Sequence, residues 1–167
     1  VDSKKINDLK NGKIPIFEPG LAKVVNQSIS NNCLFFSTNY KKSIQESDII
    51  FLAIGTPMKK NGESNLEYIN SAAERIGKFI QSYKLVVVKS TVPVGTSMKV
   101  DKIIKKQIKR RKIKIDFDIA NNPEFLKEGK AVNDFMSPDR IVVGLNNIEN
   151  RKIFKDLYKP FLSIMIN

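Results

Sequence analysis

Two carboxylates and a set of hydroxyl side chains directly follow apolar segments of this sequence. Glu124 and Glu128 lie in NNPEFLKEG, which comes after the apolar run FDIA. Thr56 follows DIIFLAI, and Ser90 and Thr91 follow KLVVVK. Hydroxyl groups can orient a polar ligand or a water molecule, and a carboxylate can accept a proton from that water. These residue types predict a ligand site if the fold brings the three segments together.

The segments around these residues alternate between predicted strands and predicted helices. Apolar runs of strand length predict strands at LFFST, DIIFLAI, KLVVVKS, FDIA and RIVVGL. Between them, IPIFEPG is a predicted loop, because Pro15 and Pro19 interrupt regular structure. Apolar residues at helical spacing predict helices over Ser3–Asn11, Leu21–Ile29, Asn39–Glu46, Asn65–Ser82, Thr96–Arg111, Lys127–Phe135 and Ile148–Tyr158, with Pro160 beyond the last of them.

This order of elements predicts an α/β fold with a doubly wound parallel sheet. The strands DIIFLAI and KLVVVK are apolar throughout, as strands are when helices cover both faces of the sheet. In such sheets, ligands bind at the carboxyl ends of the strands. Thr56, Ser90, Thr91 and Glu124 are therefore expected at one edge. Gly95-Thr96 opens a helix there, and a helix amino end favours an anion.

Composition limits the functional classes. The 167 residues are 41% hydrophobic and 28% charged, as in a globular protein, with no apolar run of the roughly 18 residues that cross a membrane. A net charge of +12 raises the odds of an anionic partner, but the basic residues are spread out and lack interleaved aromatics, so we expect no nucleic-acid partner. One cysteine and no histidine fit a reducing compartment and argue against a zinc site or a histidine-dependent triad.

Several longer motifs occur in a fixed order. KSTVPVGT, NNPEFLKEGKAVNDF and PDRIVVG follow one another, and IPIFEPGL and GTP precede them. Together they resemble the UDP-glucose/GDP-mannose dehydrogenase family over essentially the whole chain, and most of all its UDP-glucose 6-dehydrogenase branch. The resemblance implies a Rossmann-like NAD-binding domain over residues 1–167. It also implies oxidation of a nucleotide-sugar alcohol to a carboxylate by two hydride transfers to NAD, through a covalent cysteine intermediate.

The same resemblance implies roles for individual residues. Glu124 resembles the family's acid/base that works with the hydrolytic water, and Thr91 is placed to help orient that water. Glu128 resembles a residue that meets the nicotinamide side of the cofactor, and Lys5 matches a basic residue near the adenosine ribose. The implied cofactor-binding set is Lys5, Thr56, Ser90, Thr91, Val92 and Glu128. The implied substrate-binding set is Glu124, Phe125, Leu126, Lys127 and Glu128, and no metal is expected.

By this resemblance, parts of the family's catalytic apparatus lie outside the sequence. The first strand, Gly-rich loop and helix would precede Val1, and the central helix and C-terminal domain would follow residue 167. We therefore expect a truncated domain without dehydrogenase activity of its own. Asp2 matches the second, less critical acid of a pair that the family has near the adenosine ribose. The alternative is that Asp2 itself binds this ribose. Cys33 lacks the sequence context of the family nucleophile and is expected to be a packed structural cysteine.

The function that follows is NAD-dependent oxidation of UDP-glucose to UDP-glucuronate in the cytoplasm, by a full-length protein that forms a homodimer or larger assembly. Two alternatives stay open. One is a nucleotide-sugar dehydrogenase for GDP-mannose or UDP-N-acetylmannosamine. The other is a non-catalytic module that binds a nucleotide at the sheet edge. No membrane partner is expected.

Overall fold

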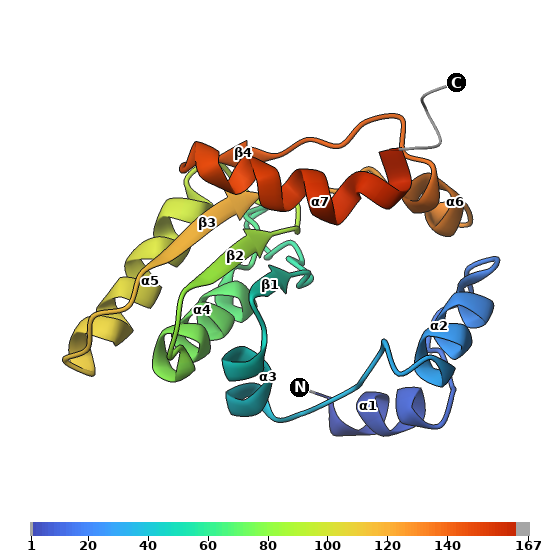
Figure 1. Cartoon of the computed structure of the whole chain (residues 1–167), viewed down its shortest axis with the longest axis horizontal. Helices are drawn as coiled ribbons and strands as arrows, with labels where there is room; N and C mark the ends of the chain where they lie inside the picture. Colours follow the sequence, from blue (N-terminus) through green and yellow to red (C-terminus); the bar gives the residue numbers. More distant parts are fainter. Residues whose placement is uncertain (1, 163–167) are drawn as a thin grey trace. The chain divides into compact units, whose positions relative to one another are not determined.

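The chain forms two compact units in the computed structural model, which describes residues 2–162 (Figure 1). The sheet unit comprises Tyr40–Glu124 and Ile141–Asp156. The helical unit comprises, within the described residues, 2–39, 125–140 and 157–162. Each unit combines segments that are far apart in the sequence.

A four-stranded sheet forms the centre of the sheet unit. Its order is β1 (Ile49–Leu52), β2 (Lys84–Val88), β3 (Phe117–Asn121) and β4 (Gly144–Leu145). The pairs β1–β2 and β2–β3 are parallel, so all three strands end at the same edge (Figure 1). The predicted α/β class with a parallel sheet is thus confirmed for these strands. The prediction fails at RIVVGL, where only two residues pair, and they run antiparallel to β3.

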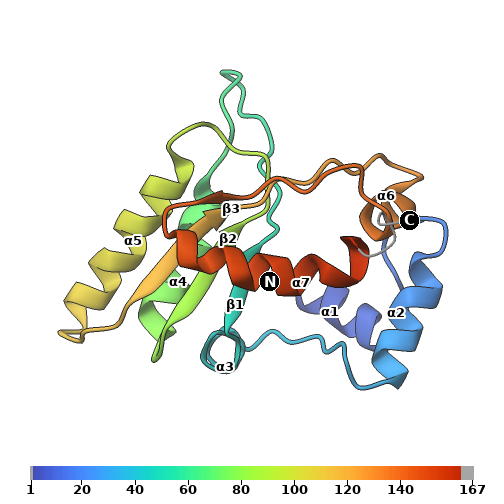
Figure 2. The same cartoon turned by 45° about the horizontal axis from the view of Figure 1, so that its top comes forward.

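Three helices of the sheet unit lie next to this sheet: α3 (Tyr40–Glu46), α4 (Glu67–Phe79) and α5 (Thr96–Arg110). Figure 2 shows α4 and α5 side by side along the strands. Their apolar faces bury Ile69, Ile76 and Ile104 against Val86 and Val88 of β2. The two helices approach closely at Gly77, where an added Cβ would lie 2.6 Å from Cβ of Gln107. A glycine is therefore required by packing here rather than by its backbone angles.

A network centred on one carboxylate fixes the opposite end of the strands. Oδ2 of Asp118 accepts hydrogen bonds from the Tyr83 hydroxyl at 2.8 Å, Nδ2 of Asn147 at 3.0 Å and Nδ2 of Asn150 at 2.8 Å. Asn147 precedes the 3-10 helix η1 (Ile148–Asn150), and Asn150 is its last residue. This network ties η1 to the beginnings of β2 and β3.

The helical unit contains α1 (Ser3–Lys10), α2 (Leu21–Ser30), α6 (Ala131–Met136) and the last residues of α7 (Arg151–Leu162). Asp2 caps α1, because Oδ1 accepts a hydrogen bond from the Lys5 N–H at 3.0 Å. Two predictions fail here. LFFST is not a strand, because no strand among residues 2–162 forms a ladder with residues 34–38. Pro160 lies inside α7, in its last turn rather than beyond it.

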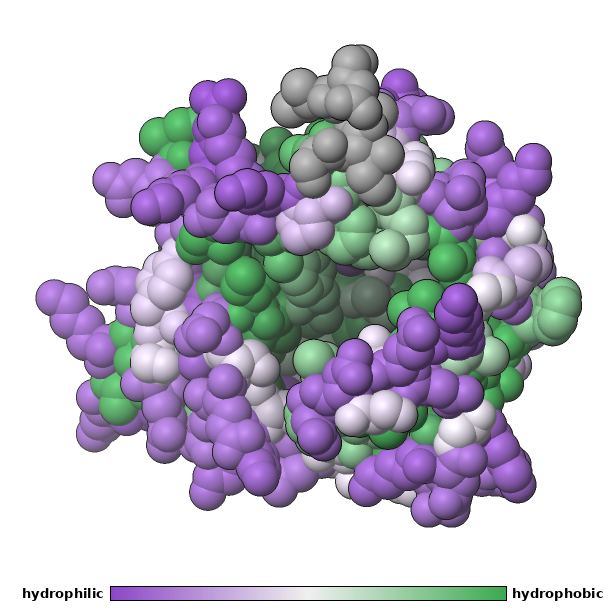
Figure 3. All heavy atoms as spheres, turned by 45° about the vertical axis from the view of Figure 1, so that its right-hand side comes forward, coloured by the Kyte–Doolittle hydropathy of each residue, from purple (hydrophilic) through white to green (hydrophobic). Residues whose placement is uncertain are grey.

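The surface is dominated by polar side chains. On the face drawn in Figure 3, most side chains along the outline are hydrophilic, although some hydrophobic ones also reach it. This agrees with the 29 lysine and arginine residues of the chain. A search of residues 2–162 finds no helix with the length and apolar character needed to cross a membrane.

Candidate functional site

The loops after β1 and β2 are joined at the carboxyl edge of the sheet. The hydroxyl of Thr56 donates a hydrogen bond to the backbone carbonyl of Thr91 at 3.1 Å. These two threonines were predicted to meet at this edge, and the structure brings them into direct contact. Thr91 is exposed, and its own hydroxyl makes no hydrogen bond within residues 2–162. That hydroxyl can therefore serve a ligand or a water molecule.

Ser90 holds the end of β1. The backbone N–H of Ile54 donates to Oγ of Ser90 at 2.8 Å, and the Ser90 hydroxyl donates to the carbonyl of Ile54 at 2.6 Å. The single hydroxyl proton of Ser90 and one acceptor site on its oxygen are thus used within the protein. Val92, two residues further on, is half-buried and packs against the core. In this geometry, Ser90 and Val92 set the position of Thr91 between them.

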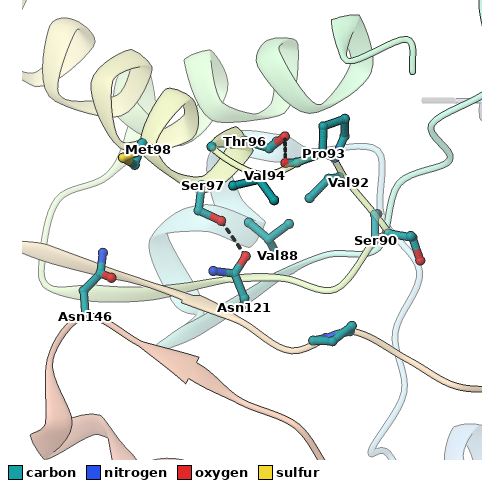
Figure 4. A pocket seen from close by; sticks show the side chains of 13 residues that line it. Val88, Ser90, Val92, Pro93, Val94, Thr96, Ser97, Met98, Asn121 and Asn146 are labelled. Carbon is teal, nitrogen blue, oxygen red and sulfur yellow. Dashed lines mark hydrogen bonds between the residues drawn. The ribbon is translucent and has the colours of Figure 1, made fainter. Parts of the chain in front are cut away.

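A hollow of about 430 Å³ opens between the β2 loop and the end of β3. The chain from Ser90 to Met98 forms most of its wall, with Val88, Asn121, Pro123 and Asn146 (Figure 4). Ser97 points toward Asn121 and donates a hydrogen bond to its Oδ1. Gly95 has φ of 89°, a left-handed conformation that glycine adopts without strain, and it leads directly into α5. The amino end of a 15-residue helix therefore faces this hollow.

Lys89 is a residue of this edge that sequence reasoning missed. Its Nζ donates to the backbone carbonyl of Asn122 at 3.4 Å and lies 3.5 Å from Oδ1 of the same residue. Burial lowers the pKa of Lys89, and the negative charge of Glu124 acts in the opposite direction. The lysine at the end of KLVVVK, next to the predicted Ser90 and Thr91, was the available signal. A strand-terminal lysine is usually solvated, so the signal was weak.

Asn122 connects this lysine to the next segment of the sheet unit. It is buried, and its side-chain amide donates to the carbonyl of Val142 at 2.9 Å. Glu124, which follows after Pro123, is half-buried at the same strand end. The structure therefore places Glu124 in the electrostatic environment of Lys89, on the edge that also carries Thr56 and Thr91.

The remaining predicted residues belong to the helical unit. The guanidinium of Arg140 lies 4.9 Å from the centre of the Phe125 ring, a cation–π contact that orients both side chains. Leu126, Lys127 and Glu128 are exposed. Lys5 is exposed on α1, beside a small hollow that Asp2 and Lys13 also line. Cys33 is exposed rather than packed, and its thiol lies 3.4 Å from the carbonyl of Asn31.

Comparison with known proteins identifies the family of this chain. Residues 1–162 match the model of the UDP-glucose/GDP-mannose dehydrogenase family, NAD binding domain. The chain belongs to this family. A UDP-glucose 6-dehydrogenase of Bacillus subtilis is 45% identical over 161 residues, which is 96% of this chain and 34% of that protein. A UDP-glucose 6-dehydrogenase of Pseudomonas aeruginosa is 36% identical over 96% of this chain and 36% of its own length.

Solved structures of family members share the fold. A UDP-glucose dehydrogenase of Pyrobaculum islandicum superposes with a TM-score of 0.89 at 35% identity, over 95% of this chain and 37% of that one. A GDP-mannose dehydrogenase of Pseudomonas aeruginosa gives the same TM-score, identity and coverage. The predicted Rossmann-like NAD-binding fold is confirmed. The chain spans about a third of the length of these two UDP-glucose 6-dehydrogenases.

The residues at the sheet edge suit a dinucleotide cofactor. A cofactor of this kind offers hydroxyls, amides and phosphates, which bind best to hydroxyl groups, backbone N–H groups and a helix amino end. The Thr91 hydroxyl, the loop through Gly95 and the start of α5 provide these groups around the hollow. Among residues 2–162, no group of three histidine, cysteine, aspartate or glutamate side chains could hold a metal ion.

Proposed function

We propose that this chain is the NAD-binding domain of a dehydrogenase that oxidises UDP-glucose to UDP-glucuronate. The observation that carries the proposal is the strand-end arrangement, in which Thr56 bonds to the Thr91 carbonyl and Glu124 lies in the field of Lys89. Support also comes from the family to which the chain belongs and from relatives named UDP-glucose 6-dehydrogenase. When bound, NAD would supply the acceptor for the two hydrides.

In this proposal, the chain contributes the water-handling half of the reaction. Glu124 accepts a proton from the water that releases the acid product, and the free hydroxyl of Thr91 orients that water. Lys89 adds a positive charge beside Glu124 at the same edge of the sheet. The covalent intermediate needs a thiol, and Cys33 is assigned no part in it because it lies in the helical unit against Asn31.

The other predicted residues bind and position. The cofactor is contacted by Thr56, Ser90, Thr91 and Val92. Because the Ser90 hydroxyl is hydrogen-bonded to Ile54, Ser90 contacts the cofactor through its backbone carbonyl. Lys5 contacts the adenosine ribose end. Phe125, Leu126 and Lys127 lie against the nucleotide sugar with Glu128, which also meets the nicotinamide. The full-length enzyme would work as a dimer or larger assembly in the cytoplasm.

Spectrophotometry of the intact protein tests this proposal. We expect UDP-glucose to produce two molecules of NADH per molecule consumed, whereas the 167-residue chain alone produces none. Faster turnover of GDP-mannose than of UDP-glucose would transfer the assignment to the GDP-mannose branch, to which one of the matching structures belongs. Nucleotide binding without NADH formation from any nucleotide sugar would favour a non-catalytic module and refute the dehydrogenase proposal.

A further inference from the structure

A carboxylate from a distant part of the sequence holds the start of α6. Oε1 of Glu18 accepts a hydrogen bond from the backbone N–H of Ala131 at 2.7 Å, and Oε2 accepts one from Gly129 at 2.9 Å. All three residues belong to the helical unit, although 111 residues separate Glu18 from Gly129. The proposed function assigns no role to Glu18.

The sequence EPGL explains why Glu18 is held firmly. The N–H of Leu21 donates to the Glu18 carbonyl at 3.1 Å, which closes a four-residue turn. Pro19 and Gly20 occupy its central positions, and Gly20 has φ of 81° and ψ of −16°. These are the residue types and angles of a type II turn. Because α2 begins at Leu21, the turn and the helix together fix the backbone from which the Glu18 side chain extends.

The segment before α6 needs acceptors from elsewhere. Lys130 precedes the helix, and a lysine side chain has only donors, so it cannot cap the N–H groups of the first turn. Gly129 is in the left-handed region with φ of 80°. Two carboxylates accept hydrogen bonds from the backbone of this segment. Asp134 accepts from the N–H of Lys127 at 3.0 Å, and Glu18 accepts from Gly129 and Ala131.

Glu18 thus acts on the backbone immediately beside Lys127 and Glu128. Both hydrogen bonds involve an ionised acceptor and are short, and such bonds are stronger than bonds between neutral groups. Glu18 is half-buried, which limits competition from water. Gly20 adds a backbone constraint, because its φ of 81° lies in the left-handed region that side-chain-bearing residues rarely adopt. The turn therefore sets the place where the chain enters α6.

We propose that Glu18 is a positioning residue for nucleotide-sugar binding, which it supports by fixing the backbone of the Phe125–Glu128 segment through Gly129 and Ala131. This inference rests on the proposed function, in which that segment contacts the nucleotide sugar. A carboxylate that only capped α6 would affect stability and leave substrate affinity unchanged. A positioning residue changes the KM for the nucleotide sugar more than it changes kcat or the KM for NAD.

Two variants of Glu18 remove these hydrogen bonds to different degrees. Glu18→Gln keeps one acceptor oxygen but turns an NH₂ group toward the second N–H, and Glu18→Ala removes both acceptors. From the usual contribution of hydrogen bonds to charged groups, we expect the KM for UDP-glucose to rise about threefold in the first variant and about tenfold or more in the second. Glu74→Gln is the matched control, because it removes one negative charge from an exposed position of α4.

Hydrogen exchange of the intact protein, read by mass spectrometry over residues 125–136, tests the structural half independently of any activity. We expect faster exchange in both Glu18 variants and no change in Glu74→Gln. Unchanged exchange in Glu18→Ala would overturn the inference, even if the wild-type protein oxidises UDP-glucose. Faster exchange with an unchanged KM would reduce Glu18 to a helix cap and would also overturn the positioning role. Absence of wild-type turnover would instead refute the proposed function, and the positioning role with it.

Discussion

Removal of the Asp118 carboxylate should destabilise the sheet unit through three lost hydrogen bonds. Asp118→Ala leaves the Tyr83 hydroxyl and the amides of Asn147 and Asn150 without their shared acceptor. Tyr83 is 45% exposed and lies 3.1 Å from Oδ1 of Asn150, so its hydroxyl can bond to that oxygen or to water instead, whereas Asn150 is only 5% exposed and its side-chain amide is shielded from water. A buried donor left unsatisfied costs about 1–3 kcal/mol, so we expect a total loss of about 2–4 kcal/mol in the free energy of unfolding.

The effect should depend on pH with a defined sign. Burial raises the pKa of Asp118, but hydrogen bonds from Asn150, Tyr83 and Asn147 outweigh it, so the pKa lies below its ordinary value. A depressed folded-state pKa contributes stability above the unfolded-state pKa, and that stability is lost as the pH falls through the folded-state pKa. The difference between wild type and Asp118→Ala should therefore shrink below about pH 4.

Urea unfolding of the 167-residue chain measures this difference, and Asp116→Ala is the control because Asp116 is exposed on the approach to the same strand. A second readout is the titration of Tyr83, whose pKa is raised to about 12 by burial and by the hydrogen bond and charge of Asp118. In Asp118→Ala this pKa should fall. A loss of stability below about 0.5 kcal/mol, equal to that of Asp116→Ala, would refute the reasoning.

Three further substitutions test the packing of the sheet unit, the end of β1 and the role of Glu124. Gly77→Ala should destabilise the sheet unit by about 1–3 kcal/mol in urea unfolding, because its Cβ would lie 2.6 Å from Cβ of Gln107; an unchanged midpoint would contradict this packing. Ser90→Ala should cost about 1–2 kcal/mol in the free energy of unfolding, since the backbone N–H and carbonyl of Ile54 both lose their hydrogen bond to the Ser90 hydroxyl, and Ser90→Thr, which keeps the hydroxyl, is its comparison. In the intact enzyme, Glu124→Gln should slow release of the covalent intermediate more than the first hydride transfer in rapid-quench kinetics. Equal slowing of both steps would argue against a base.

The parallel strands and the long helices were predictable because their signals are local. The apolar runs at DIIFLAI and KLVVVK became β1 and β2, and the periodicity of 65–82 and 96–111 became α4 and α5. LFFST carries the same kind of signal, yet it forms no strand because a strand also needs a partner. Pro160 was expected to lie beyond the end of the last helix, but it is accommodated in the last turn of α7.

What the sequence determined by itself is the pattern that each segment imposes on its own backbone: apolar strands, amphipathic helices, the loop at IPIFEPG and polar residues after each strand. The order of its motifs also indicated the family. Only the tertiary structure decided which of these groups meet. The hydrogen bond from Thr56 to Thr91 joins residues 35 positions apart, and so does the pairing of Lys89 with Glu124. The hydrogen bond that Glu18 accepts from Gly129 joins residues 111 positions apart. Such contacts depend on how elements pack, and local sequence does not encode that distance.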